Sequence, residues 1–277
     1  MSRRIRLDAE LVRRGLARSR EQASELIAAG RVTVDGARAS KPATQVTTDQ
    51  AVVVKDAEND PGYASRGAYK LLGALEAFEP LGLTVAGRRC LDAGASTGGF
   101  TDVLLRRGVR EVVAVDVGYG QLVWALQQDP RVAVHDRTNV RELEVDTIGG
   151  PVDLVVSDLS FISLTLVMPA LARVCDAGGD MVLMVKPQFE VGKDRVGKKG
   201  VVRDPALHVE AVLGVCRAAE AVGWGTRAVA ASPLPGPTGN VEYFGWFRRD
   251  APPVAEDEVR AAVDAGPLGS PNGREHQ

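Results

Sequence analysis

An acidic residue followed by small residues stands at positions 91–100, where the sequence reads LDAGASTGGF. Asp92 ends an expected strand, and the small residues after it let the backbone approach a ligand at the N-terminus of the next helix. The spacing is neither the GxGxxG of dinucleotide-binding folds nor a P-loop, because no Lys-Ser/Thr pair follows. It is the D-x-G-x-x-x-G spacing typical of S-adenosylmethionine sites. The candidate cofactor-binding residues of this loop are Asp92, Gly94, Ser96, Thr97, Gly98 and Gly99.

Two further acids follow the next two expected strands. Asp116 comes directly after a strand at 112–115, where a carboxylate can accept hydrogen bonds from both ribose hydroxyls of such a cofactor. Asp136 follows a strand at 132–134 and is placed to accept from an adenine amine, with Arg137 as a neighbouring candidate. Any one of these residues alone could be a turn residue or a helix cap. Three successive strand ends favour a cofactor site, and a nicotinamide oxidoreductase is the structural alternative.

Charged residues also stand at the ends of two later strands. Asp158 follows the strand expected at 154–156, and Lys186 follows the strand expected at 181–185. The carboxyl ends of parallel strands meet at one edge of a sheet, where ligands of α/β proteins bind. Burying either charge without a partner would be costly. This pair therefore favours a functional interpretation.

Glu242 and Lys70 are the remaining candidates. Glu242 enters a strand expected at 243–248 that runs in the opposite direction, so its start reaches the same edge of the sheet. Lys70 stands near the start of an amphipathic helix, on the side away from its apolar face. Taken alone, Lys70 could be a solvated helix lysine, and Glu242 could pair with Arg248 or Arg249.

Four motifs together resemble the TlyA family of ribosomal RNA 2′-O-methyltransferases, which belong to the FtsJ-like ribose methyltransferases. The motifs are SRGAYKL at 65–71, the loop at 92–100, SDLSFISL at 157–164 and VKPQFE at 185–190. The resemblance covers roughly residues 3 to 248 and implies S-adenosylmethionine as the methyl donor. It also implies a Lys-Asp-Lys-Glu catalytic tetrad, which falls on Lys70, Asp158, Lys186 and Glu242.

The family methylates cytidine ribose in small-subunit RNA and, in many members, in large-subunit RNA. A ribose hydroxyl must lose its proton as it attacks the methyl group. A lysine, with an ordinary pKa of about 10.4, serves as base only if burial and a second cation lower that pKa toward about 7–8. Alternatively, the lysines stabilise the developing negative charge, and alignment of hydroxyl and methyl contributes most. The sequence leaves both open.

The first 60 residues read as a separate small module. Ser19 is a helix N-cap with Gln22 three residues on, Gly30 ends that helix, and the Asp35-Gly36 pair predicts a hairpin. The segment resembles an S4-type RNA-binding module, as the family resemblance requires. Its expected phosphate contacts are Arg4, Arg6, Arg18 and Arg20.

The charge distribution is uneven although the formal net charge is only -2. Residues 1–41 hold ten Lys/Arg and five Asp/Glu, and residues 186–203 hold six and two. Residues 250–277 hold two and six. Two basic regions offset by an acidic tail fit a polyanionic partner. The alternative is that the N-terminal arginines form a solvated surface and the 186–203 region grips the RNA.

From residue 61 onward the pattern alternates between strand and helix. The expected strands are 89–91, 112–115, 132–134, 154–156, 181–185, 227–230 and 243–248. Such alternation predicts a parallel sheet covered on both faces. The loop at 232–240 is too short for a helical crossover, so the last two strands should be antiparallel. We therefore predict an α/β, class I (Rossmann-like) seven-stranded methyltransferase domain over 61–250. An α+β S4-type domain is expected over 1–60 and an acidic, flexible tail over 251–277.

The composition excludes several classes of protein. The three cysteines are far apart and lack metal-ligand spacing, so neither a disulfide framework nor a metal is expected. We expect no signal peptide, and the most apolar stretch is interrupted by charges. We expect a cytoplasmic monomer that acts on ribosomal RNA or ribosomal subunits, with no membrane partner.

Other activities need residues that this chain places differently. An amino methyltransferase would usually show Asp/Asn-Pro-Pro-Tyr/Phe where this chain has Ser157-Asp158-Leu159-Ser160. A cytosine carbon-5 enzyme needs a cysteine near the site, whereas Cys175 lies on the following helix. A pore-forming haemolysin would need a long membrane segment. A pure RNA-binding protein would not need an intact cofactor loop.

Overall fold

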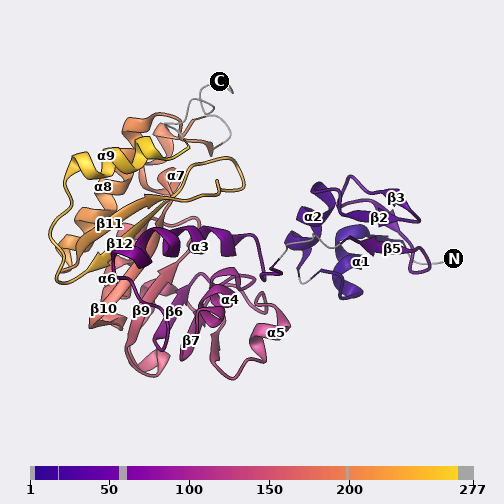
Figure 1. The fold of residues 1–277 in the computed structure, drawn as a ribbon, viewed down its shortest axis with the longest axis horizontal. Coiled ribbons are helices and arrows are strands. Elements are labelled where there is room, and N and C mark those ends of the chain that lie inside the picture. Colours follow the sequence, from indigo (N-terminus) through magenta and orange to yellow (C-terminus); the bar gives the residue numbers. More distant parts are fainter. Residues whose placement is uncertain (1–3, 18, 56–60, 198–199, 268–277) are drawn as a thin grey trace.

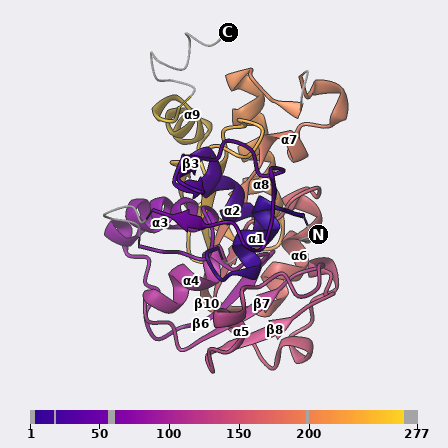
Figure 2. The same cartoon turned by 90° about the vertical axis from the view of Figure 1, so that its right-hand side faces the viewer.

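The computed structural model describes residues 4–17, 19–55, 61–197 and 200–267. In Figure 1 the chain forms a small N-terminal body and a larger body that follows it. Figure 2, turned by 90°, views the same chain from the side on which the small body lies. The two bodies are built from different kinds of sheet.

The small body contains two helices and two short antiparallel sheets. Its elements are β1 (Ile5–Arg6), α1 (Leu7–Arg13), α2 (Arg20–Ala28), β2 (Val32–Val34), β3 (Ala37–Arg38), β4 (Gln45–Val46) and β5 (Val52–Val54). β1 pairs with β4, while β2 pairs with both β3 and β5. The side chain of Ser19 accepts a 3.1 Å hydrogen bond from the backbone N–H of Gln22, which confirms the predicted N-cap. Leu7, Leu11 and Ile27 are buried in the core of this body.

The larger body is built on a seven-stranded sheet, as predicted. Its strands are β6 (Arg89–Ala93), β7 (Glu111–Val115), β8 (Val132–His135), β9 (Val152–Ser157), β10 (Cys175–Val185), β11 (Gly225–Ala231) and β12 (Tyr243–Arg248). They lie in the order β11-β12-β10-β9-β6-β7-β8. β12 is antiparallel to both of its neighbours, and the pairs from β10 to β8 are parallel. The carboxyl ends of β6, β7, β8, β9 and β10 therefore meet the start of β12 at one edge.

Helices cover both faces of this sheet. They are α3 (Gly67–Phe78), α4 (Gly99–Arg106), α5 (Trp124–Gln127), α6 (Leu164–Val174), α7 (Pro187–Glu190), α8 (Pro205–Ala221) and α9 (Glu256–Ala265). Leu91 and Val155 point into the core shared with α6, α8 and α9. Cys90 and Leu154, their strand neighbours, point into the core shared with α3, α4 and α5. Because both faces are buried, these strands are apolar on both sides.

The expectation of a flexible tail is wrong for residues 256–265. These residues form α9, which packs against α8 and β11 (Figure 1). Val259 and Val263, four residues apart on one helical face, are fully or almost fully buried in the core. The acidic residues of α9 occupy its other faces, so the overall charge of the segment hid its apolar stripe.

Candidate active site

The glycine-rich loop between β6 and α4 has little room for side chains. Gly94 has a φ of +88°, and a Cβ there would lie 3.0 Å from the carbonyl oxygen of Asp158. Gly98 has a φ of +98°, and a Cβ there would lie 2.3 Å from a methyl group of Leu126. The first position brings the backbone close to the strand end that carries Asp158. The absence of a side chain at Gly98 lets the first turn of α4 pack closely against Leu122 and Leu126.

A cavity of about 540 Å³ opens beside this loop. Gly94, Ser96 and Asp116 line it on one side, with Thr138 and Asn139 nearby. Its other lining residues are Val117, Gln121, Val140, Asp158, Leu159, Ser160, Phe161, Ile162 and Val167. Its volume and mixed lining suit a nucleoside-sized ligand. We refer to it as the cofactor cavity.

Asp116 stands at the end of β7, where the sequence predicts it. One carboxylate oxygen accepts a 2.8 Å hydrogen bond from the backbone N–H of Ser96, and the other accepts 2.7 Å from that of Gly118. These bonds tie the glycine-rich loop to the loop after β7. They also hold the carboxylate at the wall of the cofactor cavity.

Of the eight expected cofactor ligands, five do not line the cofactor cavity: Asp92, Thr97, Gly98, Gly99 and Asp136. Asp136 accepts a 2.9 Å hydrogen bond from the backbone N–H of Gly120 and is not among the lining residues of the cofactor cavity. Thr138 and Asn139 line the cavity instead. Thr138 and Asn139 are polar and stand two and three residues after Asp136. That spacing was the sequence signal that could have identified them as lining residues.

Asp92 is fully buried behind the loop and lines neither cavity described in this section. It accepts a 2.7 Å hydrogen bond from the Thr101 hydroxyl, which fastens β6 to α4. Burial raises the pKa of Asp92 to about 7, against the effect of the Thr101 hydrogen bond. Asp92 therefore stabilises the junction of β6 and α4 from within the core and does not face a ligand.

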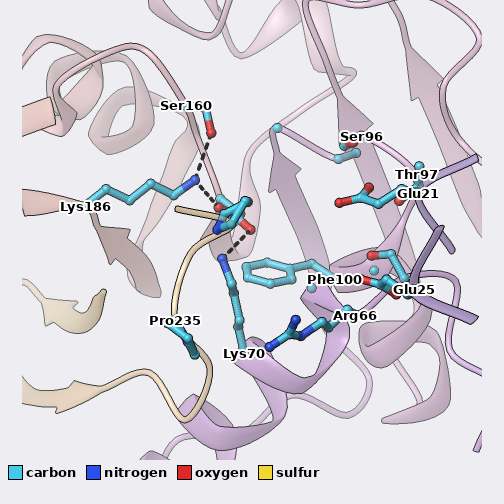
Figure 3. A pocket seen from close by; sticks show the side chains of 17 residues that line it. Glu21, Glu25, Arg66, Lys70, Ser96, Thr97, Phe100, Ser160, Lys186 and Pro235 are labelled. Carbon is cyan, nitrogen blue, oxygen red and sulfur yellow. Dashed lines mark hydrogen bonds and ion pairs between the residues drawn. The ribbon is translucent and has the colours of Figure 1, made fainter. Parts of the chain in front are cut away.

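A second cavity, of about 300 Å³, adjoins the first (Figure 3). Gly94, Ser96, Asp158 and Ser160 line both cavities. Thr97 and Gly99 line only the second cavity. Lys70 and Lys186 also line it, and their amino groups converge on Asp158. We call it the catalytic cavity, and the shared wall means that ligands in the two cavities would be neighbours.

The structure brings the four expected catalytic residues together. Lys70 Nζ lies 2.6 Å from Oε2 of Glu242 and 3.8 Å from Oδ2 of Asp158. Lys186 Nζ lies 2.6 Å from the other oxygen, Oδ1, of Asp158. Lys70, Lys186 and Glu242 are 8%, 6% and 1% exposed. Asp158 therefore stands between two buried cations, one of which is already paired with Glu242.

The alternative interpretations of Lys70 and Glu242 are wrong. Lys70 is not solvated, because its side chain is buried against Met184 and its amino group lies in the catalytic cavity. Arg248 pairs with Asp250 rather than with Glu242, and the guanidinium of Arg249 lies over the ring of Trp224. The charged groups of the site therefore have one another as partners.

Ser160 is a site residue that the motif analysis did not single out. Lys186 Nζ donates a 2.9 Å hydrogen bond to its hydroxyl (Figure 3). Asp158 Oδ1 lies closer to Nζ, but the geometry there is that of an ion pair rather than of a directed hydrogen bond. Ser160 therefore fixes one direction of the Lys186 ammonium group, which has three donors.

The small body reaches the mouth of the catalytic cavity. Glu21 and Glu25 of α2 line it together with Arg66, which precedes α3 (Figure 3). Burial, followed by repulsion from Glu21, raises the pKa of Glu25, while Arg66 lowers it. The mouth of the cavity therefore presents two carboxylates beside one guanidinium.

The N-terminal arginines are only partly available for phosphate contacts. Arg6 and Arg20 both donate to the buried carboxylate of Asp8, at 2.9–3.0 Å and 2.9 Å. The hydrogen bond from Arg6 is the main cause that lowers the pKa of Asp8 to about 2. Arg4 is exposed. Arg18 lies outside the described residues.

The described residues contain neither a metal-binding cluster nor a membrane-spanning helix. No group of three or more His, Cys, Asp or Glu side chains in the described ranges is arranged to hold a metal ion. In the same ranges, no helix combines the length and apolar character that a membrane crossing requires.

Comparison with known proteins identifies the family to which the chain belongs. Residues 63–249 match the family described as FtsJ-like methyltransferase, and residues 5–52 match the S4 domain. The protein named 16S/23S rRNA (cytidine-2'-O)-methyltransferase TlyA from Mycobacterium tuberculosis is 59% identical over 273 residues. These span 96% of this chain and 100% of the relative. A provisionally named rRNA methyltransferase from Bacillus subtilis, YqxC, is 42% identical and aligns over 88% of this chain and 85% of its own length.

A solved structure agrees with these matches. A provisionally described hemolysin from Streptococcus thermophilus has 36% identity and a TM-score of 0.75, and the alignment covers 95% of each chain. The expected methyltransferase family and S4 resemblance are confirmed, and the family implies S-adenosylmethionine as the methyl donor. The chain belongs to the TlyA family of FtsJ-like methyltransferases and carries an S4 domain ahead of its methyltransferase domain.

Proposed function

We propose that the protein methylates the 2′-hydroxyl of a cytidine in ribosomal RNA, of the small subunit and also of the large subunit. The relative from Mycobacterium tuberculosis is named for this reaction on both RNAs. The observation that carries the proposal is the meeting of Lys70, Asp158, Lys186 and Glu242 in a cavity that shares a wall with the cofactor cavity.

The cofactor cavity fits S-adenosylmethionine. Gly94 lies at the wall that the two cavities share, and the Asp116 carboxylate faces the cofactor cavity as an acceptor for ribose hydroxyls. Leu159 and Ile162 supply apolar lining for an adenine ring. When bound, the cofactor supplies an electrophilic methyl group on a positively charged sulfur.

The residues of the catalytic cavity would act on the ribose. The two lysines are held by carboxylates, and ammonium groups donate hydrogen bonds but cannot accept them. In this arrangement they stabilise negative charge on the attacking oxygen, while Asp158 and Glu242 fix their positions. As the oxygen–methyl bond forms and the sulfur–methyl bond breaks, the hydroxyl proton passes to solvent, or to Lys186 if that amine has already lost a proton. Alignment of the hydroxyl contributes further, by up to about 7–11 kcal/mol for an ideally oriented pair.

The first 60 residues would dock the RNA, in keeping with the S4 match over residues 5–52. All four proposed catalytic residues come from one chain, so a monomer is proposed as the active form. With ribosomal RNA as substrate, the proposed place of action is the cytosol.

The test uses ribosomal subunits from cells that lack this methylation. Purified protein and S-adenosylmethionine should create a position that resists alkaline cleavage, because a 2′-O-methyl group removes the hydroxyl that attacks the phosphate. Lys186→Ala should abolish the product while binding S-adenosylmethionine normally. A methylated base with a free 2′-hydroxyl would contradict the proposed reaction, and tight binding of NADH in place of S-adenosylmethionine would contradict the proposed cofactor.

A further inference from the structure

The described residues 192–197 and 200–203 form a stretch that we call the basic segment. It follows α7, which itself begins one residue after Lys186. Lys193 and Arg203 are exposed on it. Val202, close to its end, is buried in a small apolar cluster with Val191 and Ala211. Cations of the segment are thus exposed, while Val202 is held against the larger body.

Both backbone polar groups of Val202 are bound by side chains from elsewhere in the chain. Its N–H donates a 3.0 Å hydrogen bond to Oδ1 of Asn240. Its carbonyl oxygen lies 3.0 Å from Nε2 of His208. Asn240 also donates from Nδ2 to the carbonyl oxygen of Gly200 at 2.8 Å and to the Thr238 hydroxyl at 3.0 Å. A fully buried asparagine therefore fastens two points of the basic segment.

The hydrogen positions on His208 follow from its partners. The carbonyl oxygen of Val202 can only accept, so Nε2 must carry the proton and donate. Nδ1 is then the acceptor of a 3.1 Å hydrogen bond from the Tyr243 hydroxyl. His208 is fully buried, and burial lowers its pKa, which favours this neutral form. The chain of bonds thus runs from Val202 through His208 to Tyr243.

Asn240 and Tyr243 stand on either side of Glu242 in the sequence. The loop before Glu242 also packs directly on its side chain. Gly236 donates from its backbone N–H to the carbonyl oxygen of Asn240 at 2.9 Å. A Cβ on Gly236 would lie 2.6 Å from Oε1 of Glu242, so only a glycine leaves the carboxylate its place. The loop that Asn240 fastens is therefore the loop that confines Glu242.

We propose that Asn240 is a positioning residue that couples the basic segment to the Lys70–Glu242 pair. RNA phosphates held by the exposed cations of this segment would fix Val202 and, through Asn240 and His208, the strand start that carries Glu242. The inference rests on the proposed function, because it assumes an RNA substrate. It assigns the basic segment a part in aligning the site as well as in binding.

The central experiment compares Asn240→Ala with wild type at saturating RNA and S-adenosylmethionine. We expect kcat to fall by about 10- to 100-fold, as misplacement of a reacting group does. The KM for RNA and the Kd for S-adenosylmethionine should change by less than about threefold, since an aligning group leaves binding largely intact. Val259→Ala on α9 is the control for lost stability, because Val259 is buried and lines neither cavity. A kcat loss no larger than that of this control overturns the proposal.

A double-variant cycle tests the coupling itself. Arg203→Glu should lower kcat in the wild-type background and have little further effect on kcat when Asn240 is already alanine. Additive effects of the two changes would overturn the proposal. His208→Gln, which keeps a donor for the Val202 carbonyl, should retain more activity than His208→Leu. Equal losses in both histidine variants would count against the Val202 connection.

Hydrogen exchange gives a readout that does not depend on activity. In Asn240→Ala, exchange at the backbone amide of Val202 should accelerate, because that amide loses its acceptor. Exchange in β6 should stay unchanged. Unchanged protection of Val202 would contradict the assigned contact. If wild-type protein methylates no RNA at all, the proposed function fails. This exchange measurement still tests the hydrogen bond between Val202 and Asn240 separately.

Discussion

Lys70 donates a 2.6 Å hydrogen bond from Nζ to Oε2 of Glu242 across 172 positions of the chain. α3 is the first helix of the larger body, and β12 is the last strand of its sheet. The pair forms only when the two ends of the domain have come together. The catalytic cavity is therefore a product of the completed fold.

The buried pair allows stability to be separated from activity. Removing one partner of a buried ion pair leaves an uncompensated charge and costs about 3–5 kcal/mol. We expect Lys70→Met and Glu242→Gln each to lower the free energy of unfolding, with Glu242→Gln the milder of the two. The double variant should be more stable than the sum of the single effects predicts. Urea unfolding measures the cycle, and additive losses would show that the pair is not coupled.

The methyl-transfer activities of the same variants should not follow the order of their stabilities. Lys70→Met and the double variant should lose most activity, because a thioether cannot replace the ammonium at the cavity. Glu242→Gln keeps that ammonium and should lose less. Recovery of activity together with stability in the double variant would remove Lys70 from the proposed catalytic set. The assay is incorporation of labelled methyl groups into ribosomal RNA.

Cofactor binding distinguishes Asp116 from Asp136. Asp116 faces the cofactor cavity, so Asp116→Asn should weaken S-adenosylmethionine binding by about 10- to 100-fold, the usual worth of hydrogen bonds to a charged group. Asp136→Asn should have a smaller effect, because its carboxylate serves the Gly120 backbone. Calorimetric titration measures both. Equal losses in the two variants would return Asp136 to the list of direct ligands.

Asp92 makes folding stability depend on pH. Its pKa is about 7 in the folded protein, against about 3.9 for an exposed aspartate. Between these values the unfolded chain has released a proton that the folded protein keeps. Stability from this group therefore falls as pH rises toward 7 and is level above it, with a slope of at most about 1.4 kcal/mol per pH unit.

Asp92→Asn should flatten that dependence, because an amide can still accept the Thr101 hydrogen bond but does not ionise. Unfolding free energies at about pH 5 and about pH 7 provide the comparison. A wild-type slope preserved in the variant would mean that another group causes it. S-adenosylmethionine binding should change little, since Asp92 does not line the cofactor cavity.

The sequence predicts those parts of the site that depend on strand ends. Asp116, Asp158 and Lys186 each follow a run of apolar residues, and parallel strands bring their ends to one edge regardless of loop details. The parallel sheet and the reversal of its last strand followed from the same alternating pattern. These features are local in sequence, so local reasoning reaches them.

Other features depend on contacts between distant segments. The burial of Lys70 needs Met184 and Glu242, which a helical wheel cannot show. The pairing of Arg20 with Asp8 joins two different elements. For α9, the spacing of Val259 and Val263 was a usable signal that the acidic composition concealed.

The N-terminal arginines give a last prediction, based on the salt dependence of RNA binding. Each phosphate contact that is lost should lower the slope of log affinity against log salt by about 0.7–0.9. Arg4→Ala should show this reduction with stability unchanged, because Arg4 is exposed. Arg20→Ala should show it together with some loss of stability, because Asp8 loses one of its two arginine partners.

Arg260→Ala, which removes an exposed arginine paired with Glu256 on α9, is the matched control and should leave the slope unchanged. S-adenosylmethionine binding should be the same in all three. If the slope responds to Arg203→Ala but to neither N-terminal variant, the basic segment holds the RNA and the arginines of the S4 domain do not.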